Sequence, residues 1–244
     1  MTAALVGALA ALVGGFIKGT LGFGFPTIST PLLAMFVDPK TAVAVLVPPN
    51  IVLDGIQARR GGGLAATVRR LAVLMAFGAI GTVVGTRLLI TLPPHVVSAV
   101  LGGFVLVFVA LHATKWQPRV AARWEPWLAA PVGLTAGVIG GITNVPGTPL
   151  VMYYYALGMP KPEFVRAVSV SFILYKLVQL AALVWYGAFT WSLVPATAGV
   201  TAVALGAFFV GMKVQDRLDQ PTFNRVVLVY LAALGLGLTL RSLA

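Results

Sequence analysis

Ten apolar segments follow one another along this chain, and short stretches rich in basic residues, glycine and proline separate them. Only 9% of the 244 residues are charged, whereas about a quarter of the residues in an average soluble domain are charged. Apolar segments of about 20 residues cross the hydrocarbon core of a bilayer as helices. The pattern therefore predicts an all-α integral membrane protein. The segments lie at residues 3–21, 26–37, 41–58, 71–91, 95–114, 127–142, 147–158, 164–186, 190–212 and 223–241.

Two of these segments, 26–37 and 147–158, are too short to cross a bilayer. Each has about 12 residues, which as a helix cover about 18 Å of a hydrocarbon core of about 30 Å. Each follows a break rich in glycine and proline, "GTLGFGFP" in one case and "GGITNVPGTP" in the other. We therefore expect about eight full transmembrane helices plus two short half-helices.

The order of these segments repeats after a shift of 122 residues. The pair Gly15 and Gly19 then falls on Gly137 and Gly141, and both copies run helix, break, short helix, polar turn, long helix and two further helices. A repeat of this kind indicates an internal duplication. The predicted parts are a first transmembrane repeat at 1–114, a cytoplasmic linker at 115–126 and a second transmembrane repeat at 127–244.

Basic residues predict which loops face the cytoplasm. The loop at 59–70, the linker at 115–126, the turn "MPKPEFVR" and the stretch at 213–225 carry most of the arginines and lysines, and such loops stay inside the cell. An odd number of crossings per half satisfies this bias. It gives the two repeats opposite orientations in the inner membrane, with both termini periplasmic. Each half crosses five times if its short segment crosses, and three times if that segment forms a re-entrant hairpin; both possibilities stay open.

Several function classes find no support in the sequence. No nucleic-acid-binding module accompanies the net charge of +11, there is no cysteine, and the two histidines, His95 and His112, stand alone. No P-loop, H-E-x-x-H motif or plausible Ser/His/Asp set occurs. We therefore expect neither an enzyme nor a metal or cofactor site. The opening stretch "MTAALVGALAALVGG" lacks a basic region before its apolar run, so it predicts a mature transmembrane helix instead of a cleaved signal.

The two breaks predict a binding site for a small anion. Unwound backbone at membrane depth has to be buried in protein or line a cavity, and a half-helix N-terminus presents free N–H groups and a partial positive charge. Interruptions at matching places in two inverted halves are typical of secondary transporters. The alternatives are that Gly15-x-x-x-Gly19 only packs helices and that Lys18 snorkels to the interface. The predicted substrate-binding residues are Lys18, Gly19, Thr20, Gly22, Gly24, Thr27, Asn144, Gly147, Thr148 and Lys176.

Four further polar residues, Asn50, Asp54, Gln57 and Gln179, lie within apolar segments. Asp54 falls on Lys176 at the 122-residue shift, so an Asp54–Lys176 ion pair or a coupling site near the midplane is expected. The alternative is a solvated Asp54 near the cytoplasmic end, beside Arg59. The motif Gly81-x-x-x-Gly85 is compatible with packing within one chain or between chains, so the sequence leaves the oligomeric state open.

The chain resembles the sulfite exporter TauE/SafE family of membrane proteins over nearly its whole length. The stretches that carry the resemblance are "GGFIKGTLGFGFPTISTPLLAMFVDPKTAVAV" and "GLTAGVIGGITNVPGTPLVMYYYALGMPKPEFVRA". The resemblance implies an inner-membrane permease with seven or eight spans that exports a small sulfur-containing anion, such as sulfite or an organosulfonate like sulfoacetate. The only partners expected are this anion and membrane lipid. The alternatives are import of a similar small anion and a membrane scaffold without transport.

Overall fold

The computed structural model describes residues 2–60, 62–97, 119–223, 225–226 and 229, and in this part every regular element is a helix. Six of these helices are long and apolar enough to cross a membrane, which confirms the all-α membrane class. The predicted segments 95–114 and 223–241, and the predicted place of the C-terminus, lie largely outside the described residues. The six helices are α1 (Thr2–Leu21), α3 (Pro39–Ala58), α5 (Ala72–Thr91), α7 (Glu125–Thr143), α9 (Lys161–Trp185) and α10 (Val194–Arg217).

The two short helices, α2 (Phe25–Ala34) and α8 (Gly147–Ala156), fold back along the long helices that precede them. In the first hairpin the Ser29 hydroxyl of α2 donates to the Ala10 carbonyl of α1 at 2.9 Å. In the second the Tyr153 hydroxyl of α8 donates to the Glu125 carbonyl of α7 at 2.9 Å. Each short helix therefore forms a hairpin with the long helix before it, as the re-entrant alternative describes.

Three residues that lie outside the helices separate the two arms of each hairpin, and their backbone explains the reversal. Gly22 and Gly24 have φ values of 87° and 103°, and Asn144 has a φ of 65°. These lie in the left-handed region, which glycine enters freely and asparagine more easily than most other residues. The breaks occupy residues 22–24 and 144–146, so the sequence located both of them.

The boundaries of the helices repeat at the predicted spacing. The helix pairs α2 and α8, α3 and α9, and α5 and α10 each begin 122 residues apart. α1 ends at Leu21 and α7 ends at Thr143, again 122 residues apart. The left-handed residues Gly22 and Asn144 have the same offset.

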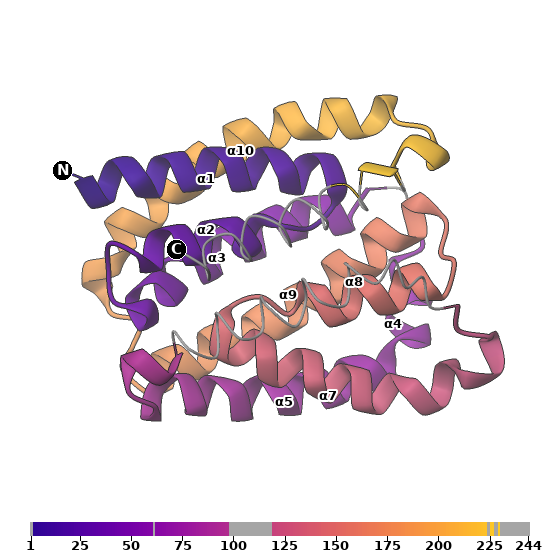
Figure 1. Cartoon of the computed structure of the whole chain (residues 1–244), viewed down its shortest axis with the longest axis horizontal. Helices are drawn as coiled ribbons and strands as arrows, with labels where there is room; N and C mark the ends of the chain where they lie inside the picture. Colours follow the sequence, from indigo (N-terminus) through magenta and orange to yellow (C-terminus); the bar gives the residue numbers. More distant parts are fainter. Residues whose placement is uncertain (1, 61, 98–118, 224, 227–228, 230–244) are drawn as a thin grey trace.

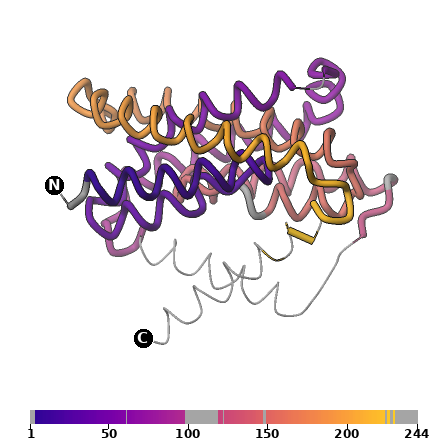
Figure 2. The backbone as a smooth tube through the Cα atoms, turned by 90° about the horizontal axis from the view of Figure 1, so that it is seen from above, coloured from indigo at the N-terminus to yellow at the C-terminus, as the bar shows by residue number. Residues whose placement is uncertain are grey.

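The helices form two edge pairs around a central pair (Figure 1). α1 lies beside α10 along one edge, α5 lies beside α7 along the opposite edge, and α3 contacts α9 between them. Figure 2, seen from above, shows that the long helices run roughly along one common axis. α1 runs parallel to α10, and α7 runs parallel to α5. The two pairs run in opposite directions, so the α1–α2 hairpin and the α7–α8 hairpin enter the bundle from opposite ends (Figure 1).

One short helix was not expected from the sequence. Residues Leu64–Arg70 form α4, where the sequence predicted only a basic loop. Gly63 begins this helix in the left-handed conformation, with a φ of 72°. The helix lies across the ends of the long helices on the side where α7 and α9 begin (Figure 1). Two single 3₁₀ turns, Ala122–Trp124 and Trp191–Leu193, precede α7 and α10.

Glycines bring the backbones of the edge pairs into direct contact. A Cβ atom added at Gly19 would stand 2.2 Å from the Phe208 carbonyl oxygen of α10, and one added at Gly137 would stand 2.1 Å from the Gly78 carbonyl oxygen of α5. Gly81 and Gly85 likewise face α7 of the same chain, at 2.3 and 2.2 Å from its carbonyl oxygens. The motif Gly81-x-x-x-Gly85 therefore packs helices within the chain, as small-residue stripes do in membranes.

Gly211→Ala is expected to destabilise the protein by about 1–3 kcal/mol, the usual cost of overpacking. The added Cβ would stand 2.2 Å from the Phe16 carbonyl oxygen, a backbone atom that cannot rotate away. Thermal unfolding in detergent measures the effect. Gly206→Ala is the matched control, because Gly206 is exposed on the same helix and has no atom within 4 Å of the added Cβ. Equal melting temperatures for the two variants would contradict close α1–α10 packing.

Candidate functional site

Three charged side chains are buried in the described part of the chain: Lys18, Asp54 and Lys176. They come from the three helices α1, α3 and α9, and their exposed fractions are 0%, 0% and 1%. Charges at this depth are costly, so they are rare in membrane proteins and mark functional sites by default. The interior of the bundle is therefore the place to look for the binding site.

Lys18 pairs with Asp54, with 2.6 Å between Nζ and Oδ1. Its ammonium group also donates to the Gly22 carbonyl at 3.4 Å and lies 5.4 Å from the centre of the Phe172 ring. Lys18 stands one turn before the end of α1, so its long side chain reaches both the break and α3. The predicted direct ion pair between Asp54 and Lys176 is therefore wrong, because Asp54 pairs with Lys18. A snorkelling Lys18 and a solvated Asp54 are wrong as well, because both side chains are fully buried.

Lys176 is held by neutral oxygens. Its Nζ donates to the Asn144 carbonyl at 2.9 Å, to the Asn144 side-chain oxygen and to Gln179 Oε1 at 2.8 Å. These three acceptors use all three protons of the ammonium group. Asp54 lies close enough to Lys176 for an electrostatic interaction, but its direct ion pair is with Lys18. The second buried lysine therefore has no directly paired carboxylate to neutralise its charged form in the described structure.

Asn144 joins the two halves of the molecule. Its side-chain Nδ2 donates to the Thr30 hydroxyl of α2 at 3.0 Å, while both of its oxygens accept from Lys176. Gln179 reaches the same break from the other side, because its Nε2 donates to the carbonyls of Gly140 and Gly141 at 3.2 and 3.1 Å. The break after α7, the half-helix α2 and the central helix α9 thus meet at one side chain.

Several buried polar atoms near these charges have no hydrogen-bond partner among the described residues. They are both side-chain atoms of Asn50, Oδ2 of Asp54, Oε1 of Gln57 and the Ser169 hydroxyl. The Ser169 hydroxyl lies beside the Asp54 carboxylate as a hydrogen-bonding neighbour, although the contact falls outside normal hydrogen-bond geometry. Gln57 Nε2 makes one long contact with Gln215 Oε1 of α10, at 3.5 Å. Unpaired buried polar groups are uncommon, and here Asn50, Asp54 and Gln57 follow one another at one-turn spacing on α3, where their free atoms are available to water or a polar ligand.

Some of the predicted substrate-binding residues lie among the buried polar contacts, and the others do not. Lys18 and Gly22 belong to the polar contacts around Asp54, Asn144 and Lys176 belong to the polar contacts around Gln179 and Thr30, and Gly24 shapes the first break. Gly19 packs against α10, as in the packing alternative, and the Thr20 hydroxyl donates to the Phe16 carbonyl of its own helix at 3.0 Å. Thr27 is half-buried. Gly147 and Thr148 stand at the start of α8, and the Thr148 side chain lies outside the described part.

Sequence reasoning missed Thr30 and Ser169. Thr30 is fully buried on α2 and accepts from Asn144. The signal for it was its place on the half-helix that follows the first break, one turn after Thr27. Ser169 lies two turns before Lys176 on α9, so the same helical spacing that singled out Gln179 applied to it.

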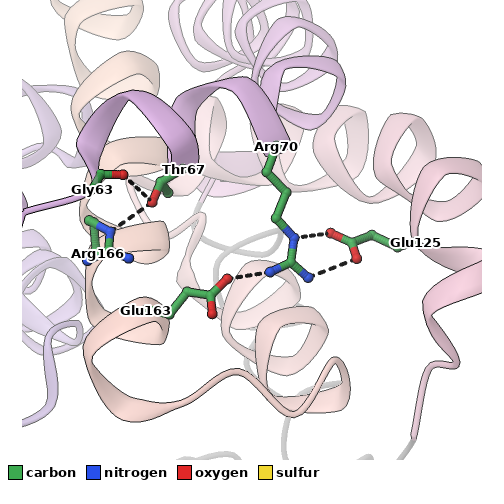
Figure 3. A network of polar contacts seen from close by, with 6 residues as sticks. All are labelled: Gly63, Thr67, Arg70, Glu125, Glu163 and Arg166. Carbon is green, nitrogen blue, oxygen red and sulfur yellow. Dashed lines mark hydrogen bonds and ion pairs between the residues drawn. The ribbon is translucent and has the colours of Figure 1, made fainter.

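A second polar network closes one end of the bundle (Figure 3). Arg70 of α4 makes two hydrogen bonds to Glu125, at 2.7 and 2.9 Å, and also pairs with Glu163 at the start of α9. The hydrogen bonds to Glu125 raise the pKa of Arg70, so it stays cationic. Arg166 Nε donates to the Thr67 hydroxyl at 2.8 Å. These contacts join α4 of the first half to α7 and α9 of the second.

The same end holds the other basic stretches that the sequence assigned to the cytoplasm. Arg60, after α3, pairs with Asp216 of α10 at 2.7 Å. Lys161 donates to the carbonyls of Gln215 and Leu218, at 2.6 Å each. The loop at 59–70, the turn before α9 and the end of α10 therefore gather on one face of the protein, as one side of a membrane requires.

No group of three or more histidine, cysteine, aspartate and glutamate side chains that could hold a metal ion occurs in the described part of the chain. The buried polar groups at the site are two lysines, the Asp54 carboxylate, amides and hydroxyls, and lysine, amide and hydroxyl groups are donors. Such groups bind anions through hydrogen bonds and charge.

Comparison with known proteins gives one family. The family model described as "Sulfite exporter TauE/SafE" matches residues 7–238, which is nearly the whole chain and confirms the resemblance seen in the sequence. The search of curated proteins found no match. The search of solved structures found none either.

Proposed function

Because the chain belongs to the sulfite exporter TauE/SafE family, whose members are membrane transporters and not enzymes, we propose that it is a secondary transporter of a small anion. The substrate is most simply sulfite or an organosulfonate. It binds between the two hairpin breaks, beside Lys176, and crosses the bacterial inner membrane by alternating access. Export is the proposed direction, as the family's description suggests.

The observation that carries this proposal is the charge of the buried network. Lys18 and Lys176 contribute two positive charges, and Asp54 contributes one negative charge. An unbalanced cation in a low-dielectric interior is unfavourable. A bound anion removes this imbalance, whereas a bound cation increases it. The network therefore favours an anionic substrate over a cationic one.

Alternating access is supported by the arrangement of the two halves. We propose that residues 1–114 and 127–244 are inverted repeats, since equivalent helices begin 122 residues apart. The first long helix of each half lies against the third long helix of the other half: α1 against α10, and α7 against α5. A pseudo-twofold axis produces this exchange. Rocking of one repeat against the other about a central site is the usual consequence in such transporters.

The orientation of the protein in the membrane is proposed from the basic end of the bundle. The face that carries Arg60, Arg70, Lys161 and Arg166 is placed in the cytoplasm by the positive-inside rule. The start of α1 then faces the periplasm. A monoanion that leaves the negatively charged cytoplasm gains about 2.3 kcal/mol per 100 mV. Export is therefore driven by the membrane potential even without a coupled ion.

Flux measurements in liposomes test this function. Purified protein reconstituted into liposomes is expected to release sulfite and short organosulfonates much faster than protein-free liposomes do. An inside-negative potential is expected to accelerate the release. Chloride and phosphate serve as unrelated anions. If none of the anions moves, the chain is not an anion transporter, and a scaffold role becomes the better interpretation.

A further inference from the structure

The three buried charges set a limit on the charge of the substrate. In the described structure Lys18, Asp54 and Lys176 are the only fully buried ionisable side chains with formal charges, and their sum is one positive charge. Every other charged side chain of the described membrane helices lies at a helix end or is at least partly exposed. An interior with one surplus positive charge becomes neutral when it binds one negative charge.

We propose that this site moves a net load of one negative charge, with Asp54 as the proton-binding residue that adjusts the balance. A monovalent anion binds while Asp54 is ionised. A divalent anion binds together with a proton on Asp54, which again leaves the site neutral. This inference rests on the proposed transport function and adds to it the charge class of the substrate and the identity of a co-transported ion.

The geometry of Asp54 fits the role of a proton acceptor. Its Oδ1 is occupied by the Lys18 ammonium group at 2.6 Å. Its Oδ2 is buried and has no hydrogen-bond donor among the described residues. A proton can therefore bind to Oδ2 without displacing Lys18. The proton comes from water on the side to which the site is open, and it leaves with the substrate on the other side.

The groups around Asp54 define which charges act on this proton. Lys18 acts from α1 and Lys176 from α9, and Ser169 of α9 is a neutral neighbour. α2 has no charged residue. The charged residues of α10, Lys213, Asp216 and Arg217, are exposed, as are Arg59 and Arg60 beyond the end of α3. Proton binding at Asp54 is therefore controlled by the two buried lysines and by the bound anion.

The inference divides sulfur anions into two classes. A sulfonate with no second acidic group carries one charge and needs no proton. Sulfoacetate carries a second charge on its carboxylate and needs one. Hydrogen sulfite brings its own proton and counts as a monovalent anion, whereas sulfite without that proton needs Asp54. Because sulfite itself titrates near neutral pH, sulfonates are the better probes.

The test compares two sulfonates in liposomes that contain the full chain and a trapped pH dye. 2-Hydroxyethanesulfonate is the monovalent probe and sulfoacetate the divalent one. A carboxyl of this kind titrates near pH 4, so neither probe changes charge between about pH 6 and pH 8. For wild type, sulfoacetate flux is expected to rise toward tenfold for each unit by which pH falls, with one proton moved per anion. Flux of 2-hydroxyethanesulfonate is expected to change less than about twofold over that range, as charge balance requires.

Asp54→Asn separates the proton from the substrate. This variant leaves two uncompensated lysines, so sulfoacetate is expected to move without a proton and with no pH dependence, while 2-hydroxyethanesulfonate flux falls below that of wild type. Asp38→Asn is the matched control, since Asp38 is an exposed cap of α3 and asparagine caps equally well.

Three outcomes would overturn the proposal, and they are distinguishable. If both probes move with the same pH dependence in wild type, the charge rule is wrong while the transport function stands; this comparison does not depend on any variant. If Asp54→Asn still moves protons with sulfoacetate, Asp54 is not the proton site. If wild type moves no anion at all, the proposed function and this inference fail together.

Discussion

Lys18→Met is expected to destabilise the protein by about 3–5 kcal/mol, because it leaves the Asp54 carboxylate buried without its cation. Lys18 Nζ lies 2.6 Å from Asp54 Oδ1, and both side chains are fully buried. The remaining carboxylate has no direct ion pair in the described structure, and its Oδ2 already lacks a donor. Thermal unfolding in detergent and the yield of monodisperse protein measure this loss.

The double variant Lys18→Met/Asp54→Asn provides the decisive comparison. It removes both charges, and replacing a buried ion pair with neutral groups is often neutral in its effect on stability. We therefore expect the double variant to be more stable than Lys18→Met alone. Lys213→Met is the control for losing a lysine, because Lys213 is exposed on α10. A double variant as unstable as the single one would show that Lys18 stabilises the fold through other contacts.

The sequence predicted the helices and their breaks well, because both depend on local chemistry. Apolar runs determine the spans, and Gly22, Gly24 and Asn144 are residues that enter the left-handed region at low cost. The short helix α4 was missed, since it has only 7 residues and no apolar run to reveal it. Arg70, the last residue of α4, contacts Glu125 and Glu163, which are 55 and 93 residues away in the chain. Contacts over such separations cannot be seen in the local sequence.

The partners inside the site were harder to predict than its members. The equivalence of Asp54 and Lys176 in the repeat suggested that they pair. The choice between Lys18 and Lys176 depends on how far each side chain reaches across the bundle, and one-dimensional spacing does not contain that distance. The sequence also could not show what Gly19 contacts. A small-residue motif has the same sequence whether it faces a ligand or, as here, the Phe208 carbonyl of another helix. Thr30 and Asn144, 114 residues apart, meet only through the tertiary fold.

Lys176→Met is expected to reduce anion flux about 100-fold while destabilising the fold less than Lys18→Met does. The variant removes the surplus positive charge, and losing one partner of a charged hydrogen-bonded contact costs about 2–5 kcal/mol of binding. The loss of stability is smaller than in Lys18→Met, because Asp54 keeps Lys18 and no buried carboxylate loses its direct ion-pair partner. It is not zero, because the two Asn144 oxygens and Gln179 Oε1 lose the lysine donor.

Anion flux and thermal unfolding of the same Lys176→Met preparation distinguish this loss of binding from a loss of folding, with Lys213→Met as the control for both measurements. The pH dependence adds a second criterion. With Lys176 gone, the buried charges of Lys18 and Asp54 cancel, so a monovalent sulfonate is balanced only when Asp54 is protonated. Part of the lost flux is therefore expected to return as pH falls, a response that wild type lacks for this probe. If Lys176→Met transports anions at the wild-type rate at neutral pH, Lys176 is not part of the binding site, and the anion would then have to bind beside Lys18.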